Sequence, residues 1–205
     1  MKFKIVSLFV LCAILISCGT SRQGGKKQRK GTKAQVVLTP EQQRKYDYFF
    51  LEASRLKMKD DYSAAFDLLQ HCLTINPNAS SALYEISQYY MYLKQVPQGQ
   101  AALEKAVEND PDNYWYSQGL ASLYQQQNEM QKATNLLESM ATRFSDRMDP
   151  LYSLLDIYNR LEEYDNVITT LNRLEEKMGK NEQLSMEKFR IYLQKKDNQL
   201  SLIHI

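Results

Sequence analysis

Apolar and polar positions divide the 205-residue chain into three stretches. Residues 5–17 are apolar or small throughout, residues 19–38 contain almost nothing that can be buried, and from Thr39 onward apolar residues return at regular intervals. At the start of this third stretch, Thr39 can cap backbone amides, Pro40 suits the first helical position and Gln42 completes a capping box. The pattern therefore predicts a helix that begins at residue 40.

After residue 39 the chain repeats itself at a constant interval. Tyr90, Tyr124, Tyr158 and Tyr192 are evenly spaced, and Leu56 holds the same phase one step earlier. Two further columns, one of leucine and one of small or modest residues, consist of Leu69, Leu103, Leu137 and Leu171, and of Ala65, Gly99, Ala133 and Val167. Internal similarity with a period of this length predicts a solenoid of stacked supersecondary units.

A 34-residue period built of two helices resembles the tetratricopeptide repeat. That family's pattern places bulky residues, a small residue and a tyrosine on the first helix, a small residue and two packing positions on the second, and proline at the turn between repeats. Residues 80–113 supply these positions with Leu83, Ile86, Ser87, Tyr90, Gly99, Leu103, Ala106 and Pro111. The third repeat has Ser145 in place of the proline, and the fourth has Leu155 where a small residue is usual.

The resemblance implies an all-α fold, a tandem helix-turn-helix solenoid that forms a right-handed superhelix with a concave face. Residues 39–199 would hold about four full repeats and a truncated fifth that begins at Glu182. Small residues at Ala53, Ser87 and Ala121 would let paired helices approach closely, while large residues fill the groove of the next repeat.

The resemblance also implies a binding groove, because four positions on the first helix of each family repeat face the concave side. The mixture of aromatic, amide and hydroxyl side chains there would suit an extended peptide. The candidate partner-binding residues are Phe50, Tyr84, Gln88, Met91, Trp115, Gln118, Gln125, Tyr152, Asp156 and Asn159. The alternative is that some of them pack on neighbouring helices.

No group of residues in the sequence indicates catalysis. The chain has two histidines, His71 and His204, and His71 with the adjacent Cys72 cannot form a metal site without further ligands. A glycine-rich phosphate loop, a nucleophile elbow and a zinc-protease pair are all missing from the sequence. We therefore expect a binding protein without catalytic residues, cofactor, metal or small-molecule substrate.

The N-terminal residues predict export. Two lysines precede the apolar run of residues 5–17, which is shorter than the roughly 20 apolar residues of a membrane-spanning helix, so residues 1–17 are interpreted as a signal peptide. The alternative is a short anchor helix that is not removed. Residues 15–18, Leu-Ile-Ser-Cys, resemble the lipobox of bacterial lipoproteins, which implies that Cys18 is lipidated and tethers the protein to a membrane.

The residues after Cys18 bear on location. Gly19 is not the aspartate that retains many lipoproteins at the inner membrane, and no acidic cluster of the kind used for surface export follows. We expect a lipid anchor in the outer membrane, with the protein on the periplasmic face and surface exposure as the alternative. Residues 18–38 would be a flexible basic linker whose cations are solvated or touch anionic head groups. No aromatic residues interleave them, so nucleic acid is not an expected partner.

The C-terminal residues interrupt the repeat. Tyr192 keeps the phase of a fifth repeat, but the chain finishes with residues 200–205, Leu-Ser-Leu-Ile-His-Ile, which a transposase adapter used in DNA library preparation also encodes. We interpret residues 200–205 as a sequencing artefact on a truncated frame, the alternative being a genuine apolar tail. The expected function is a membrane-anchored scaffold that binds envelope proteins or peptides. The alternatives are the N-terminal repeat arm of a longer envelope enzyme or of a transport-associated, glycan-binding subunit.

Overall fold

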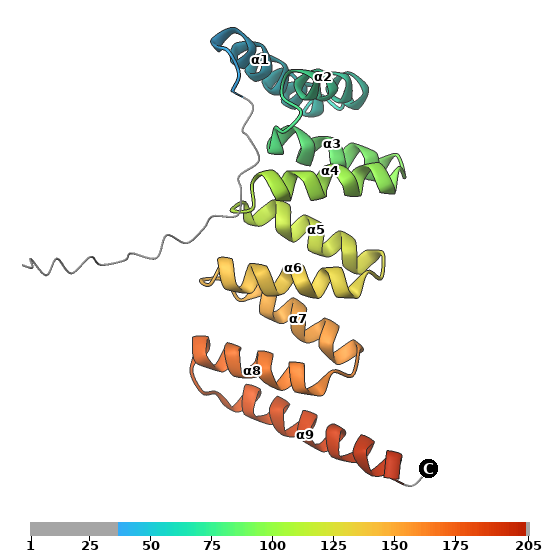
Figure 1. Cartoon of the computed structure of the whole chain (residues 1–205), viewed down its shortest axis with the longest axis vertical. Helices are drawn as coiled ribbons and strands as arrows, with labels where there is room; N and C mark the ends of the chain where they lie inside the picture. The colour runs from blue at the N-terminus through green and yellow to red at the C-terminus, as the bar shows by residue number, and fades with distance from the viewer. Residues whose placement is uncertain (1–36, 204–205) are drawn as a thin grey trace, which may run out of the picture. The chain divides into compact units, whose positions relative to one another are not determined.

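The computed structural model describes residues 37–203, with side chains described up to residue 196. Cys18, the predicted signal peptide and nearly all of the predicted linker lie outside the described residues, as do the side chains of residues 200–205. The described part of the chain consists of nine helices and no strands (Figure 1). They are α1 (Pro40–Lys57), α2 (Tyr62–Ile75), α3 (Ser80–Tyr92), α4 (Val96–Asn109), α5 (Tyr114–Gln126), α6 (Met130–Arg143), α7 (Asp149–Arg160), α8 (Tyr164–Met178) and α9 (Glu182–Ile203).

Each helix packs against the helix before it and the helix after it, so the array grows in chain order from α1 to α9 (Figure 1). The largest buried cluster extends from Leu103 on α4 to Ile191 on α9, and two smaller clusters lie under the first helices around Ala65 and Cys72. The predicted all-α tandem solenoid is confirmed. Its first helix begins as expected, since Thr39 Oγ1 accepts from the Gln42 amide at 3.2 Å and Gln42 Oε1 accepts from the Thr39 amide at 2.9 Å.

The four hairpin turns share one backbone geometry. In each turn a residue adopts the left-handed conformation, and these residues, Asp60, Lys94, Asn128 and Glu162, have φ between 57° and 62° and are spaced by one repeat period. The next amide donates to a carbonyl five residues back, as from Gln95 to Tyr90 and from Glu129 to Tyr124, both at 2.8 Å. This is the Schellman motif, which satisfies the last carbonyls of the first helix and reverses the chain.

Small residues are buried inside the hairpins, among them Ala53, Ser87 and Ala121, the positions for which the sequence predicted close helix packing. Ala65, Ala133 and Val167 are fully buried. At Gly99 an added Cβ would lie 2.8 Å from Met91 Sδ and 3.2 Å from the Ser87 carbonyl oxygen, so a side chain there would require Met91 to move and the backbones to separate slightly. α3 and α4 therefore approach closely at this position.

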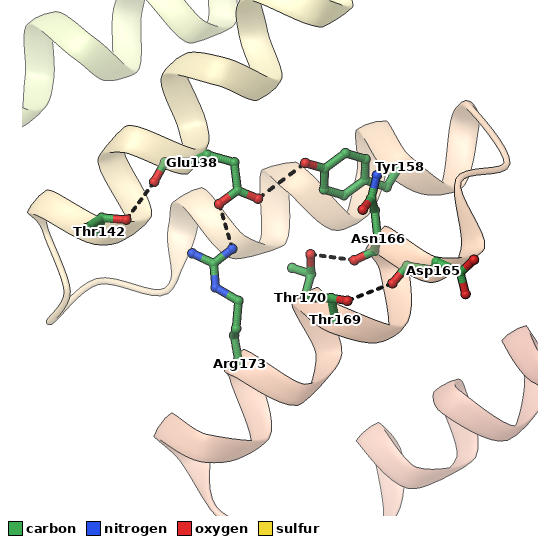
Figure 2. A network of polar contacts seen from close by, with 8 residues as sticks. All are labelled: Glu138, Thr142, Tyr158, Asp165, Asn166, Thr169, Thr170 and Arg173. Atoms are coloured by element: carbon green, nitrogen blue, oxygen red, sulfur yellow. Dashed lines mark hydrogen bonds and ion pairs between the residues drawn. The ribbon is translucent and has the colours of Figure 1, made fainter.

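Two of the evenly spaced tyrosines, Tyr124 and Tyr158, form hydrogen bonds between repeats. The Tyr158 hydroxyl on α7 donates to Glu138 Oε1 on α6 at 3.2 Å, and Arg173 Nη1 on α8 donates to Glu138 Oε2 at 2.7 Å (Figure 2). One repeat earlier, the Tyr124 hydroxyl donates to Glu104 Oε1 at 2.9 Å. Burial and the neighbouring Glu138 carboxylate raise the pKa of Tyr158 to about 12, so its hydroxyl remains a donor. These bonds tie the third repeat to the second and the fourth repeat to the third.

The last helix departs from the other repeats. α9 has 22 residues, whereas α3, α5 and α7 have 12 or 13, so α9 continues through the positions at which the other repeats turn. Tyr192 keeps the phase of the column but is 55% exposed, because no described helix covers that side of α9.

Replacing Glu162 with glycine should stabilise the array. An L-residue in the left-handed conformation costs about 1–2 kcal/mol, part of which is offset by the greater freedom of glycine in the unfolded chain, so the expected gain is about 0.5–1 kcal/mol. Urea unfolding followed by far-UV circular dichroism measures it. Glu162→Ala is the matched control because it removes the same side chain and keeps Cβ. Equal midpoints for the two variants would contradict the assigned turn.

Removing the Tyr158 hydroxyl should weaken the contact between repeats. Tyr158→Phe is expected to lower the free energy of unfolding by about 1 kcal/mol, the usual net value of one hydrogen bond. Tyr90 occupies the same column, and its hydroxyl makes no such bond to the described residues, so Tyr90→Phe should change stability by less than about 0.5 kcal/mol. If both variants lose the same stability, the hydrogen bond to Glu138 is not the cause.

Candidate partner-binding groove

The ten predicted groove residues all lie on the first helices of the four hairpins. Phe50 is on α1, three are on α3, three on α5 and three on α7. Trp115 and Tyr152 are 62% and 48% exposed, and Gln88 and Asp156 are also exposed. The others are half-buried: Phe50, Tyr84, Met91, Gln118, Gln125 and Asn159.

Two of the half-buried residues act mainly in packing. The Phe50 ring stacks on Tyr46 with centroids 5.9 Å apart and packs against both smaller core clusters. Met91 lies over Gly99 and packs against the largest cluster. Tyr84 is placed differently, because its ring lies 4.8 Å from that of Tyr116 on the next first helix. Gly119 lies beside it, and a Cβ there would meet the Tyr84 ring at 3.6 Å.

An aromatic and arginine cluster surrounds the start of α5. The guanidinium carbon of Arg147 lies 3.9 Å from the Tyr114 ring centroid and 5.4 Å from that of Trp115, within cation–π range. The buried Tyr114 hydroxyl donates toward Asp149 Oδ2 at 3.3 Å and Gln118 Oε1 at 3.1 Å. Burial, then the Asp149 carboxylate, raises the pKa of Tyr114, which keeps the hydroxyl protonated. Trp115 thus contacts Tyr114, with ring centroids 5.3 Å apart, and Arg147, while most of its surface remains exposed.

A second concentration of aromatic residues forms a cavity of about 370 Å³ lined by Lys57, Tyr62, Gln88, Tyr89 and Tyr92. We call this cavity the tyrosine pocket. It joins the end of α1, the start of α2 and the second half of α3. A neighbouring cavity shares Lys57 and Tyr62 with it and adds Ser54, Met58 and Glu85. The two cavities form one depression beside the first hairpin turn.

The polar groups of the tyrosine pocket are partly paired. Lys57 Nζ lies 2.7 Å from Glu85 Oε2, and this carboxylate raises the pKa of Lys57. The Tyr62 hydroxyl donates to Asp60 Oδ1 at 2.7 Å. Tyr89 is 8% exposed, and its hydroxyl is buried without a hydrogen-bond partner among the described residues. A buried hydroxyl with no partner costs free energy.

The family comparison agrees with the geometry. The tetratricopeptide repeat family model matches residues 80–113, the second of the four hairpins. The chain has the tetratricopeptide repeat fold. No curated protein matches the sequence.

Solved structures resemble most of the chain. A tetratricopeptide repeat protein from Parabacteroides merdae superposes with a TM-score of 0.60 and 16% identity, over 76% of this chain and 61% of that one. This chain therefore spans less than two thirds of that structure. A MamA structure from Desulfovibrio magneticus RS-1 gives 0.56 with 14% identity over 78% and 90% of the two chains. YrrB, described as a protein with an unusual peptide-binding site, gives 0.56 with 13% identity over 72% and 76%.

The repeat positions that hold the predicted groove residues continue onto α9. Met186 and Leu193 follow Tyr152 and Asn159 by one repeat period, and both are exposed. Together with Phe189 and Arg190 they line a shallow depression along α9. At these positions α9 therefore has apolar side chains, whereas α7 has the polar Asn159 one repeat period before Leu193.

Sequence reasoning identified part of this surface. It included Trp115, Gln118 and Gln88 but missed Arg147, Tyr62 and Tyr92, because these lie at turn and helix-end positions outside the family's groove columns. The tyrosine-rich run of residues 89–92 was the available signal.

Several kinds of site are missing from residues 37–203. No group of three or more histidine, cysteine or acidic residues in this part of the chain could hold a metal ion. No helix within the described residues is long and apolar enough to cross a membrane. Cys72 is buried, and burial raises the pKa of its thiol to about 11, so the thiol is protonated and unreactive at neutral pH, as expected for a core residue.

Arg147→Ala should change the environment of Trp115, the only tryptophan in the chain. We expect a shift in its fluorescence emission and a loss of about 0.5–1 kcal/mol in the free energy of unfolding, since the cation–π contacts with two rings disappear. Arg143→Ala is the control, because that guanidinium pairs with the exposed Asp112 and not with a ring. Unchanged Trp115 emission in Arg147→Ala would exclude the stacked arrangement.

Proposed function

We propose that this protein is a membrane-tethered adaptor whose array binds extended peptide segments of envelope proteins. The observation that carries the proposal is the exposed Trp115, which lies against Arg147 and Tyr114 in the column of predicted groove residues. Tryptophan, tyrosine and arginine supply most of the binding energy at protein interfaces, and all three meet here.

The groove chemistry fits a peptide ligand. Gln88, Gln125 and Asn159 have side-chain amides that can both donate to and accept from a peptide backbone. Trp115 and Tyr152 are aromatic surfaces on which side chains can pack. The resemblance to YrrB, described as having an unusual peptide-binding site, adds support at the level of the fold.

The tether is the second half of the proposal, and it rests on the sequence. A lipid on Cys18 would hold the array near the outer membrane, on its periplasmic face, and residues 19–38 would act as a flexible spacer. Restricting the array to a surface raises its effective concentration toward partners on that surface. In this proposal the function depends on where the groove is held as much as on what it binds.

A peptide array tests the groove. The full chain, purified in mild detergent, is applied to immobilised 15-residue peptides, and affinities for the strongest peptides are then measured by quenching of Trp115. Trp115→Ala combined with Tyr152→Ala should weaken binding by at least about tenfold, as for interface hot spots, measured with a dye-labelled peptide. Tyr48→Ala is the control, since Tyr48 is exposed on α1 outside the groove columns. Equal affinity for all three proteins would contradict the groove assignment.

Fatty-acid labelling tests the tether separately. Growth of the native host with radioactive palmitate should label the wild-type protein and leave Cys18→Ala unlabelled, because lipidation requires the Cys18 thiol. Membrane fractionation then shows whether the labelled protein sediments with the outer membrane. An unlabelled wild-type protein would refute the anchor and leave the groove proposal intact.

A further inference from the structure

We infer that the tyrosine pocket binds an arginine side chain of the partner peptide. This inference rests on the proposed function, because it names the residue that the first hairpin of the array would recognise. The pocket lies between the end of α1 and the second half of α3. It includes Gln88, one of the predicted groove residues, and Lys57, which precedes the groove residue Met91 by one repeat period. It is thus an extension of the groove toward the first hairpin turn.

The walls of the pocket are aromatic. The rings of Tyr62 and Tyr89 lie 6.4 Å apart and are tilted by 60° to one another, and Tyr92 supplies a third ring that is 81% exposed. The cavity of about 370 Å³ is large enough for one long side chain. A guanidinium is planar and weakly hydrated, and it stacks on tyrosine faces more readily than an ammonium does.

The polar groups around these rings offer acceptors that no described residue uses. Gln88 Nε2 donates to Ser87 Oγ at 3.2 Å, which leaves Gln88 Oε1 available. Glu85 Oε2 is paired with Lys57, which leaves Glu85 Oε1 available. A guanidinium carries five donors and no acceptor, so it complements this set.

The charges favour a cation over an anion. Glu85 and Asp60 are two carboxylates beside the pocket, and Lys57 is the one ammonium in its lining. Because Lys57 is already paired with Glu85, an acidic ligand would meet a neutralised lysine and the second carboxylate. A cationic ligand instead gains attraction from Asp60 and can share Glu85 with Lys57. An apolar side chain would fill the cavity but would use neither Gln88 Oε1 nor Glu85 Oε1.

Degenerate peptide pools test the inference. Nonapeptide pools with a fixed central arginine, citrulline, lysine, norleucine or glutamate are titrated against the full chain in detergent. Citrulline has nearly the same shape as arginine but no charge, so the comparison isolates the cation. The arginine pool should bind at least about fivefold more tightly than the citrulline pool, as expected for a partly desolvated cation–π site.

Two variants locate the preference. Tyr92→Leu keeps an apolar side chain at an exposed position and removes the ring, and Glu85→Gln removes the carboxylate; each should reduce the preference for arginine to less than about twofold. Tyr48→Leu, outside the pocket, should retain it. If the wild-type protein binds arginine and citrulline pools equally, or if neither pocket variant changes the preference, the inference is wrong while peptide binding stands. If the wild-type protein binds no pool, the proposed function itself is overturned.

Discussion

The close approach of the two helices in each hairpin is the constraint on which the rest of the array depends. It is set where the helices cross, by Ala65, Gly99, Ala133 and Val167, and at the turn by a Schellman motif with a left-handed residue. The turn and the close contact between the helices together determine how the two helices of a hairpin lie against each other. Positions one repeat period apart therefore occupy equivalent places, and a face that is apolar in one hairpin meets an apolar face of the next.

Stacking then decides which side chains remain available for binding. The second helix of one hairpin and the first helix of the next bury their contacts, and the Tyr124–Glu104 and Tyr158–Glu138 bonds fix the registry between repeats. A solenoid of this kind buries only what neighbouring units cover, so the outer face of each first helix stays open. Trp115 and Tyr152 lie on first helices and remain exposed after that packing.

The sequence predicted the fold well because the fold is nearly one-dimensional. One 34-residue period in the sequence predicts the hairpins, the evenly spaced small residues and the evenly spaced tyrosines. The capping box at Thr39 and Gln42 could be predicted from the local sequence alone. The left-handed residues were not predicted, since Asp60, Lys94, Asn128 and Glu162 share no side-chain type. Their conformation is imposed by the hairpin, not by intrinsic preference.

The candidate site was harder to predict because it combines residues from different phases of the repeat. Arg147 reaches Tyr114 across a turn between repeats, and Tyr62 meets Tyr89 across two helices; neither pair is related by the repeat period. Phe50 and Met91 fit the alternative stated for the predicted groove residues, since both are half-buried and pack on neighbouring residues.

Helix α9 has a phenylalanine, Phe189, at a repeat position where three of the first helices have a small residue. Phe189 stands in the phase of Ala53, Ser87, Ala121 and Leu155, and it is exposed. Its ring, with Met186 and Leu193, extends the apolar part of the groove columns. At α9 the column that elsewhere closes a hairpin thus adds to the surface available to a partner.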